Sequence, residues 1–171
     1  MVDIHNFNNV SDYLPILNSV IITDIFVIAL LIAGLIKSTI LKDWYKTLTL
    51  SAVIADVLII VIGIILTRFF YPYVFSEYNL LNFILLAVVI QIIHDFLFYF
   101  FSTSIERGKS KILDIFKDYG KEKGFGAIIA DSLMIISSIL IASYLKGQTL
   151  NSNIIILIFS VYLVPYMIYS L

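Results

Sequence analysis

Long apolar runs alternate with short polar ones along this chain. A helix that spans a membrane needs roughly 20 mostly apolar residues, and five segments reach that length. They end where Lys, Arg, Pro, Gly or Asn gather, and none shows the period-two alternation of a membrane strand. The predicted spans are about Pro15–Ile36, Leu48–Phe70, Leu80–Phe101, Phe125–Leu145 and Asn153–Leu171. Because Pro165 lies inside the last segment, we interpret that segment as a kinked span or an interfacial helix.

The composition agrees with a membrane location. Of the 171 residues, 61% are hydrophobic and 13% are charged, whereas soluble domains have about 45–50% apolar and about 25% charged residues. A chain of this size cannot bury so much apolar surface in a core of its own, which excludes a soluble globular protein, a disordered chain and a nucleic-acid binder. The lack of cysteine excludes disulfide and thiol chemistry. We therefore expect an all-α integral membrane protein with no nucleic-acid partner and no cofactor.

The basic residues predict an orientation in the membrane. Nine of the 11 Lys and Arg residues lie in two polar loops, and the other two, Arg68 and Lys146, lie on the opposite side. Short loops that are rich in Lys and Arg stay in the cytoplasm. The loops at 37–47 and 102–124 are therefore predicted to be cytoplasmic, with the N-terminus outside.

Both basic loops have the pattern of helices that lie at a membrane surface. Apolar side chains, aromatic ones among them, recur at helical spacing between the lysines. Lys-rich amphipathic helices of this kind lie in the headgroup plane and favour anionic lipid, although the same residues also suit ordinary anchors that flank a span. We expect the bilayer, with anionic headgroups at both loops, to be the main partner. The predicted interface residues are Trp44, Tyr45, Lys42, Arg107 and Lys109.

An internal repeat relates the two halves of the chain. The octapeptide SAVIADVL at 51–58 matches GAIIADSL at 126–133, and Asp24 parallels Asp95 at a similar offset. We interpret this as a duplicated helical hairpin with parallel copies related by a pseudo-twofold axis, against the alternative that apolar helices resemble each other by chance. The copies would cover 15–70 and 80–145, with the helix at 153–171 appended. The appended helix has almost no internal polar groups, so we expect it to face lipid or a second protomer of a homo-oligomer.

One acidic residue lies within each of the first four predicted helices. These residues are Asp24, Asp56, Asp95 and Asp131. At a rise of about 1.5 Å per residue they lie about 12 to 20 Å from the basic loops, within a hydrocarbon core about 30 Å thick. An ionisable residue at such a depth is costly and usually faces the protein interior. In a four-helix bundle with the inferred symmetry, the four carboxyl groups would converge on the central axis.

The surroundings of these acids limit what they can do. The predicted spans carry no Lys or Arg in their interior, so His94 is the candidate cation, and Gln91 lies on the same helical face as Asp95. Carboxylates that are close together cannot all stay ionised without compensation. They are protonated, they share a bound cation, or they are separated and hydrogen-bonded one by one. Small residues on the faces of Asp56 and Asp131 predict that these two helices pack closely, with both acids at the seam.

Several short stretches also carry a family resemblance. They are SAVIADVLII at 51–60, His94-Asp95-Phe96, Arg107-Gly108 and Ala-Asp-Ser at 130–132. On these stretches the chain, from about Asp12 to Leu145, resembles an uncharacterised family of polytopic membrane proteins from large (giant) DNA viruses. The resemblance implies a viral or host membrane location and no catalytic residue.

These observations lead to three functional hypotheses. The first is a membrane protein that binds or conducts protons or cations at an intramembrane acidic cluster. The second is a non-catalytic structural protein of a membrane or of a virion's internal membrane, in which neutral aspartic acids hydrogen-bond between helices. An enzyme with a metal site ranks last, because a lone His is more often a satisfied core residue than a ligand. The candidate binding residues are Asp24, Asp56, Asp95, Asp131, His94 and Gln91.

Overall fold

The computed structural model describes residues 2–171, most of which are helical. Five helices are long and apolar enough to cross a membrane, and they coincide with the five predicted spans. Their bounds are α1 Tyr13–Ile32, α3 Leu50–Val74, α4 Leu80–Ser104, α6 Phe125–Leu145 and α7 Leu150–Ile168. Two shorter helices, α2 Thr39–Leu48 and α5 Lys111–Lys123, occupy the basic loops, and a 3-10 turn, η1 Val10–Asp12, precedes α1. The prediction of an all-α membrane bundle is confirmed.

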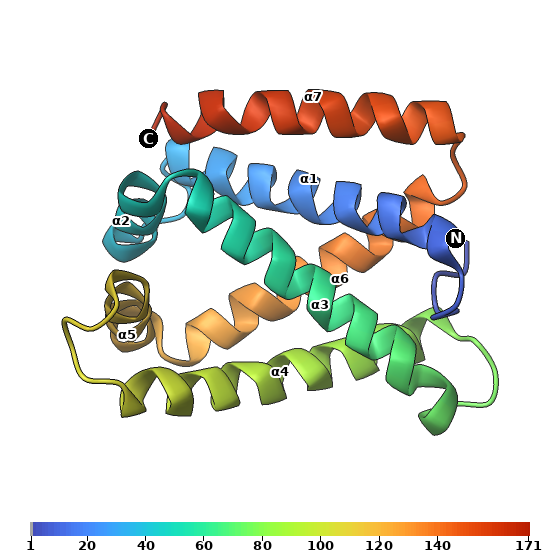
Figure 1. Cartoon of the computed structure of the whole chain (residues 1–171), viewed down its shortest axis with the longest axis horizontal. Coiled ribbons are helices and arrows are strands. Elements are labelled where there is room, and N and C mark those ends of the chain that lie inside the picture. The colour runs from blue at the N-terminus through green and yellow to red at the C-terminus, as the bar shows by residue number, and fades with distance from the viewer. Residues whose placement is uncertain (1) are drawn as a thin grey trace.

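The long helices form a crossed bundle. α3 and α6 cross near the middle of the molecule, with α1 and α7 on one side and α4 on the other (Figure 1). α1 packs against α3, α6 and α7, while α4 packs against α3 and α6. α2 and α5 lie side by side across one end, and we call this pair the lid (Figure 1). The N-terminal segment, residues 2–12, lies at the opposite end of the bundle.

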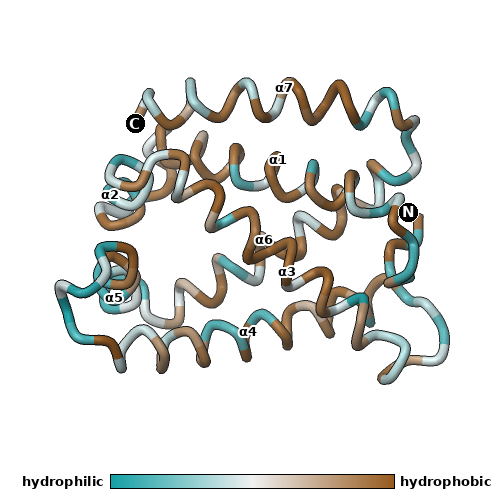
Figure 2. Tube along the Cα trace, in the orientation of Figure 1, coloured by the Kyte–Doolittle hydropathy of each residue, from teal (hydrophilic) through white to brown (hydrophobic). Residues whose placement is uncertain are grey.

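The long helices expose apolar side chains on their outer faces. On α4 an exposed stripe repeats every four residues, as expected for one face of a helix. Its members are Leu81, Leu85, Val89, Ile93 and Leu97. Hydrophobic positions follow the long helices, whereas hydrophilic ones gather in the lid and the loops (Figure 2). Outer faces of this kind indicate a lipid bilayer around the bundle.

The two lid helices begin and end in the same way. Each begins at a serine whose hydroxyl accepts a backbone N–H from the first turn, at 3.1 Å for Ser38 and 3.4 Å for Ser110. Each ends at a residue with a φ of 50°, Thr49 after α2 and Gly124 after α5, where the chain turns into the next long helix. This conformation is ordinary for glycine and unfavourable for threonine.

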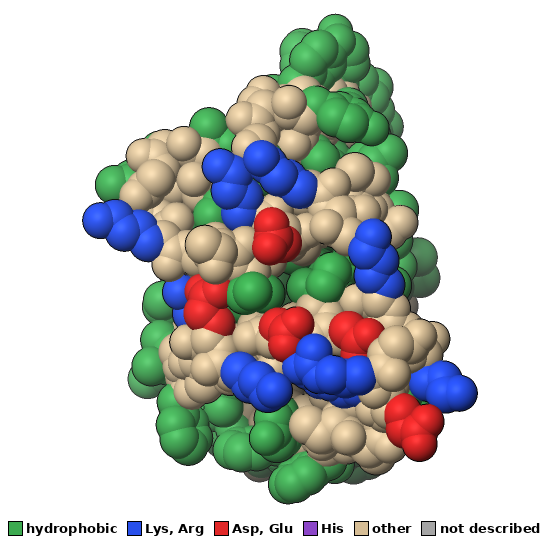
Figure 3. Space-filling view, turned by 90° about the vertical axis from the view of Figure 1, so that its left-hand side faces the viewer, with side chains coloured by type: hydrophobic (Ala, Val, Ile, Leu, Met, Phe, Trp, Pro, Cys, Tyr) green, Lys and Arg blue, Asp and Glu red, His purple; other side chains and the backbone are tan. Residues whose placement is uncertain are grey.

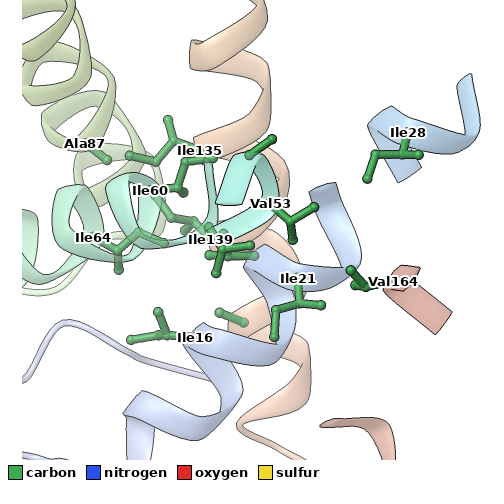
Figure 4. Packing of buried hydrophobic residues seen from close by; sticks show 14 of the residues in the cluster. Ile16, Ile21, Ile28, Val53, Ile60, Ile64, Ala87, Ile135, Ile139 and Val164 are labelled. Carbon is green, nitrogen blue, oxygen red and sulfur yellow. The ribbon is translucent and has the colours of Figure 1, made fainter. Parts of the chain in front are cut away.

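The core consists mainly of isoleucine and valine side chains from the long helices (Figure 4). Where α3 and α6 cross, a Cβ added to Gly63 would lie 3.3 Å from Cδ1 of Ile135, so the glycine permits the close approach. We predicted that these helices pack closely with Asp56 and Asp131 at the seam, and the two helices do approach each other closely at Gly63. Ser138 of α6 donates to the hydroxyl of Thr23 on α1 at 3.1 Å. Helices that cross obliquely meet in one place, so α6 packs mostly along α1.

α7 belongs to the bundle through one of its faces. The side-chain amide of Asn18, buried in α1, donates to the backbone carbonyl of Asn153 at 2.8 Å and to its side-chain oxygen at 3.2 Å. Amide hydrogen bonds between buried helix faces hold membrane helices together. The helix continues through Pro165, and its other face exposes apolar side chains such as Phe159. α7 therefore meets α1 on one face and leaves the other free for lipid.

Candidate functional site

Asp24 of α1 lies beneath the lid and is fully buried. Its Oδ1 accepts a hydrogen bond of 2.8 Å from the hydroxyl of Tyr45 in α2. Its Oδ2 is buried and has no hydrogen-bond partner. α1 ends at Ile32, so Asp24 lies about 12 Å from the end of its helix.

Asp56 of α3 contacts the neighbouring residue of the same lid helix. Nε1 of Trp44 donates to Oδ2 of Asp56 at 3.0 Å. The exposed fractions of Trp44 and Tyr45 are 5% and 1%, so both rings lie inside the protein rather than at the predicted lipid interface. The physical reason is that the rings fill the end of the bundle while their N–H and O–H groups bind carboxyl groups there.

Tyr45 acts as a hydrogen-bond donor between two acids. Burial raises the pKa of its hydroxyl well above the ordinary value, and the neighbouring carboxyl groups of Asp56 and Asp24 raise it further. The phenol therefore keeps its proton at neutral pH. It presents a neutral donor to Asp24 while it stands beside Asp56.

On the other side of the bundle Asp95 of α4 is bound by its own helix. Nε2 of Gln91 donates to Oδ1 of Asp95 at 2.7 Å, as the spacing of four residues predicted. Nδ1 of His94 lies 3.3 Å from the same oxygen, although adjacent residues of a helix do not face each other. The His94 ring stacks on Phe98, and its side chain is 36% exposed. Oδ2 of Asp95 is buried without a partner.

The four acids act on one another as a chain of neighbours. The charge of Asp56 acts on Asp24, and the charges of Asp95 and Asp56 act on Asp131. The order is therefore Asp24, Asp56, Asp131 and Asp95, across α1, α3, α6 and α4. We call this set the aspartate row. Tyr119 of α5 stands beside Asp131 and Asp56, and burial raises the pKa of its hydroxyl. The lid thus places aromatic side chains near both halves of the row, and Trp44 and Tyr45 donate hydrogen bonds to it.

Within residues 2–171 the aspartate row has no Lys or Arg partner. His94 is the one basic side chain in an ion-pair geometry with it, through Asp95. The same residues contain no group of three or more His, Asp or Glu side chains that could hold a metal ion. Apart from the contact of His94, the hydrogen bonds to the row come from neutral groups, the indole, phenol and amide described above. Neutral donors of this kind serve an ionised carboxylate without neutralising it.

A different buried acid lies at the N-terminal end of the bundle. Oδ2 of Asp12 lies 3.1 Å from Nη2 of Arg68, and Oδ1 lies 2.8 Å from Nζ of Lys146. The side chains of Asp12 and Arg68 are both 0% exposed. Arg68 also donates to two backbone carbonyl oxygens of the N-terminal segment. We call these three residues the Asp12 cluster, which ties residues 2–12 to α3 and to the end of α6.

Arg68 and Lys146 were predicted to lie on the side opposite the basic loops, and Asp12 was not predicted as their partner. The signal was nevertheless present. Arg68 lies inside the long apolar helix α3, where a charged side chain needs a partner. Asp12 directly precedes the first span, so a chain that folds antiparallel brings it to the same level. Spacing alone did not reveal that the N-terminal segment folds over this end of the bundle.

The outer surface of the lid carries most of the remaining charge. Basic and acidic side chains gather over α2 and α5, with hydrophobic side chains around them (Figure 3). The predicted interface residues Lys42, Arg107 and Lys109 are exposed. Glu122 of α5 accepts the backbone N–H of Ile40 in α2 at 3.2 Å. Hydrogen bonds, first of all from Ser38, lower the pKa of Glu122 to about 2. This carboxylate therefore joins the two lid helices.

Comparison of the chain with models of known protein families, with curated proteins and with solved structures gives no match. A functional interpretation thus rests on the geometry of the aspartate row, the lid and the Asp12 cluster.

Proposed function

We propose that this protein binds protons at the aspartate row and passes them through the membrane. The observation that carries the proposal is Asp24, which is fully buried, with one carboxylate oxygen lacking a hydrogen-bond partner. The charge that acts on it belongs to another acid, Asp56. A proton is the smallest ligand that would neutralise Asp24, and intramembrane acids of this kind belong to proton relays.

The arrangement favours protons over metal cations. Hard cations bind six or more oxygen ligands in one shell, whereas residues 2–171 contain no group of three acids or histidines that could hold a metal ion. Buried hydroxyl groups also lead away from Asp24 toward the N-terminal end. Ser138 donates to Thr23, and Thr23 donates to the carbonyl of Ser19 at 2.9 Å. These groups support passage of a proton beyond the row.

Orientation and lipid contacts form a second part of the proposal. The lid would face the cytoplasm, because nine of the 11 basic residues lie in its two loops. The exposed Lys42, Arg107 and Lys109 would then contact anionic headgroups. A location in a viral or host membrane rests on the family resemblance alone.

The two halves of the chain are proposed to be copies of one hairpin. Support comes from the lid, where Ser38 and Ser110 cap their helices with similar dihedral angles. Thr49 and Gly124 then turn the chain with ψ angles of −123° and −126°. The arrangement of α1 and α4 on either side of the crossed α3 and α6 also fits a pseudo-twofold axis (Figure 1).

A structural role is the second candidate, and a specific observation favours it. Trp44 and Tyr45 hydrogen-bond to acids on two different long helices, so the carboxyl groups fasten the lid to the bundle. Hydrogen bonds of this kind hold membrane helices together without any transport. Under this alternative the row would need acceptors but no ionisable groups.

Proton flux in liposomes separates the two candidates. The wild type is reconstituted with a pH-sensitive dye inside, a pH difference is imposed, and flux is compared with that of Asp24→Asn and Asp56→Asn. Asparagine keeps a carbonyl acceptor and cannot be ionised, so we expect flux to fall to the level of empty vesicles while the fold is retained.

The matched control is Asp43→Asn, which removes a carboxylate from the exposed face of the same lid helix. We expect its flux to equal that of the wild type. Wild-type flux no higher than that of empty vesicles, or flux unchanged in both row variants, would contradict proton passage and favour the structural role.

A further inference from the structure

The lid helix α2 is seated on the bundle by two adjacent residues. Of its ten residues, Trp44 and Tyr45 are the buried ones. Their polar atoms end on two different acids, Asp56 of α3 and Asp24 of α1. The opposite face of α2 carries exposed residues such as Lys42 and Lys46. The hold of α2 on the bundle therefore depends on how strongly two carboxyl groups accept hydrogen bonds.

The strength of these hydrogen bonds depends on the charge of the acceptor. A hydrogen bond to an ionised carboxylate is about twice as strong as one between neutral groups. A protonated carboxyl group accepts weakly through its hydroxyl oxygen and seeks an acceptor of its own. Protonation of Asp24 and Asp56 therefore weakens the contacts of Tyr45 and Trp44 with the bundle. The same change does not affect the apolar contact of Trp44 with Phe116 of α5, whose ring centroid lies 4.8 Å away.

We infer that Trp44 and Tyr45 are positioning residues that couple the protonation of Asp56 and Asp24 to the seating of α2 on the bundle. This inference rests on the proposed function and adds its regulation. When both acids are ionised, α2 is held down and covers them. When they take up protons from the water beside the lid, α2 loosens and that water gains access to the row. The lid thus controls when the row exchanges protons with its side of the membrane.

The titration of other ionisable groups near the lid must be distinguished from that of Asp24 and Asp56. On α6, Asp131 is close enough to be affected by the charge of Asp56, and on α5 the hydroxyl of Tyr119 stands near both Asp131 and Asp56. At the other end of α2, Glu122 and Lys123 of α5 contact the start of the helix. Burial raises the pKa of Tyr119, and hydrogen bonds lower the pKa of Glu122 to about 2. Neither group changes its charge between about pH 5 and about pH 9.

The chain itself supplies the probe, because Trp44 is its single tryptophan. The full chain is reconstituted in lipid vesicles, and the quenching of its tryptophan fluorescence by acrylamide is measured from about pH 9 down to about pH 5. We expect quenching to increase as the pH falls. The ratio of loose to seated α2 should change by on the order of tenfold or more, because the loss of charge assistance halves the strength of each of the two hydrogen bonds.

Three variants test the assignment. The double variant Asp24→Asn and Asp56→Asn should show quenching that is high and independent of pH. Tyr45→Phe removes one of the two polar contacts, so it should show stronger quenching at high pH and a smaller change with pH. Asp43→Asn changes the charge of α2 on its exposed face and should titrate like the wild type. Far-ultraviolet circular dichroism at each pH identifies any variant that has lost its helices, in which case Tyr45→Phe carries the test.

The result that overturns this inference is quenching of the wild type that does not depend on pH, or a pH dependence that survives in the double variant. Flux is recorded on the same vesicles, so the two proposals fail separately. If Asp24→Asn loses flux while wild-type quenching does not depend on pH, proton passage is supported and the coupling is refuted. A pH-dependent seating that disappears in the double variant, without flux in the wild type, supports the coupling and removes proton passage.

Discussion

The two ends of the bundle bury carboxyl groups in opposite ways. At the N-terminal end Asp12 contacts two cations, Arg68 and Lys146, in a cluster of three charged residues. At the lid end Asp24 and Asp56 contact the neutral donors Tyr45 and Trp44. A buried carboxylate with cationic partners is compensated by charge, so the removal of one partner would leave an uncompensated charge in the protein. A carboxyl group with neutral donors can exist with or without its proton.

This difference assigns different roles to the two ends. The Asp12 cluster holds the N-terminal segment in place on α3 and the end of α6. Under the proposed function, the aspartate row keeps its acids available for protonation, and its electrostatic compensation is weaker than that of the Asp12 cluster. Variants of the Asp12 cluster should therefore change mainly the stability of the protein. Variants of the aspartate row should change mainly its pH dependence.

The largest effect is expected from Arg68→Met. Methionine retains the length of the arginine side chain but not its charge, so Lys146 is left as the only cation beside Asp12. Removing one partner of a buried ion pair costs about 3–5 kcal/mol. The free energy of unfolding, measured in detergent, should fall by that amount, whereas Asp56→Asn should change it by less than about 1 kcal/mol.

Adding Asp12→Asn to Arg68→Met tests whether the loss comes from the unpaired charge. The double variant should recover part of the stability, since Lys146 is 21% exposed and can reach water. A cost of Arg68→Met no greater than that of Asp56→Asn would remove the distinction between the two ends.

An intermediate effect is expected from a pair of substitutions at Asp24. Asp24→Ala leaves the buried hydroxyl of Tyr45 without an acceptor, which costs about 1–3 kcal/mol. Asp24→Asn keeps an acceptor of the same shape and should cost less than about 1 kcal/mol. Thermal unfolding of both variants in the same detergent measures the difference. Equal losses for alanine and asparagine would mean that the charge of Asp24, and not its hydrogen bond, stabilises the bundle.

The smallest effect is expected at Glu122, an acid at the lid surface with donors of both kinds. Its pKa in the folded protein, about 2, lies below the ordinary value of 4.5, so the ionised form stabilises the contact between α5 and α2. That contribution is complete above about pH 4.5 and is lost as the pH falls toward about 2. Hydrogen exchange at the backbone N–H of Ile40 should show less protection in this range.

The neighbouring N–H of Leu41, which binds Ser38, serves as the internal reference. In Glu122→Gln the acid-dependent step at Ile40 should disappear. If the step persists in that variant, another group near the start of α2 is responsible.

Much of this architecture follows from hydropathy. The five spans and the two amphipathic loops were predictable, because apolar length and helical periodicity depend on local sequence. The inward face of α2 was not predictable, since an apolar face rich in aromatic residues looks the same whether it meets lipid or protein. Trp44 and Tyr45 became distinguishable only when their partners, 12 and 21 residues away along the chain, lay within hydrogen-bonding distance.

In the candidate site, too, contacts between residues close in sequence were predictable and contacts between distant residues were not. The four acids were identified because charge is rare in spans, and Gln91 was identified because its partner Asp95 is one helical turn away. The order of the row depends on how α3 and α6 cross, which no spacing reveals. Asp12 was missed because its partner Arg68 is 56 residues away.

The turns that follow the two lid helices differ in backbone strain because one contains Thr49 and the other Gly124. A threonine with a φ of 50° stores about 1–3 kcal/mol of backbone strain, while Gly124 adopts the same φ without such strain. Any rearrangement that lets Thr49 return to a negative φ releases this energy, and such a rearrangement displaces α2. The turn after α2 therefore carries backbone strain, whereas the turn after α5 is unstrained. If α2 and α5 lose equal contact energy with the bundle, α2 detaches from the bundle first, because its detachment also releases the strain at Thr49.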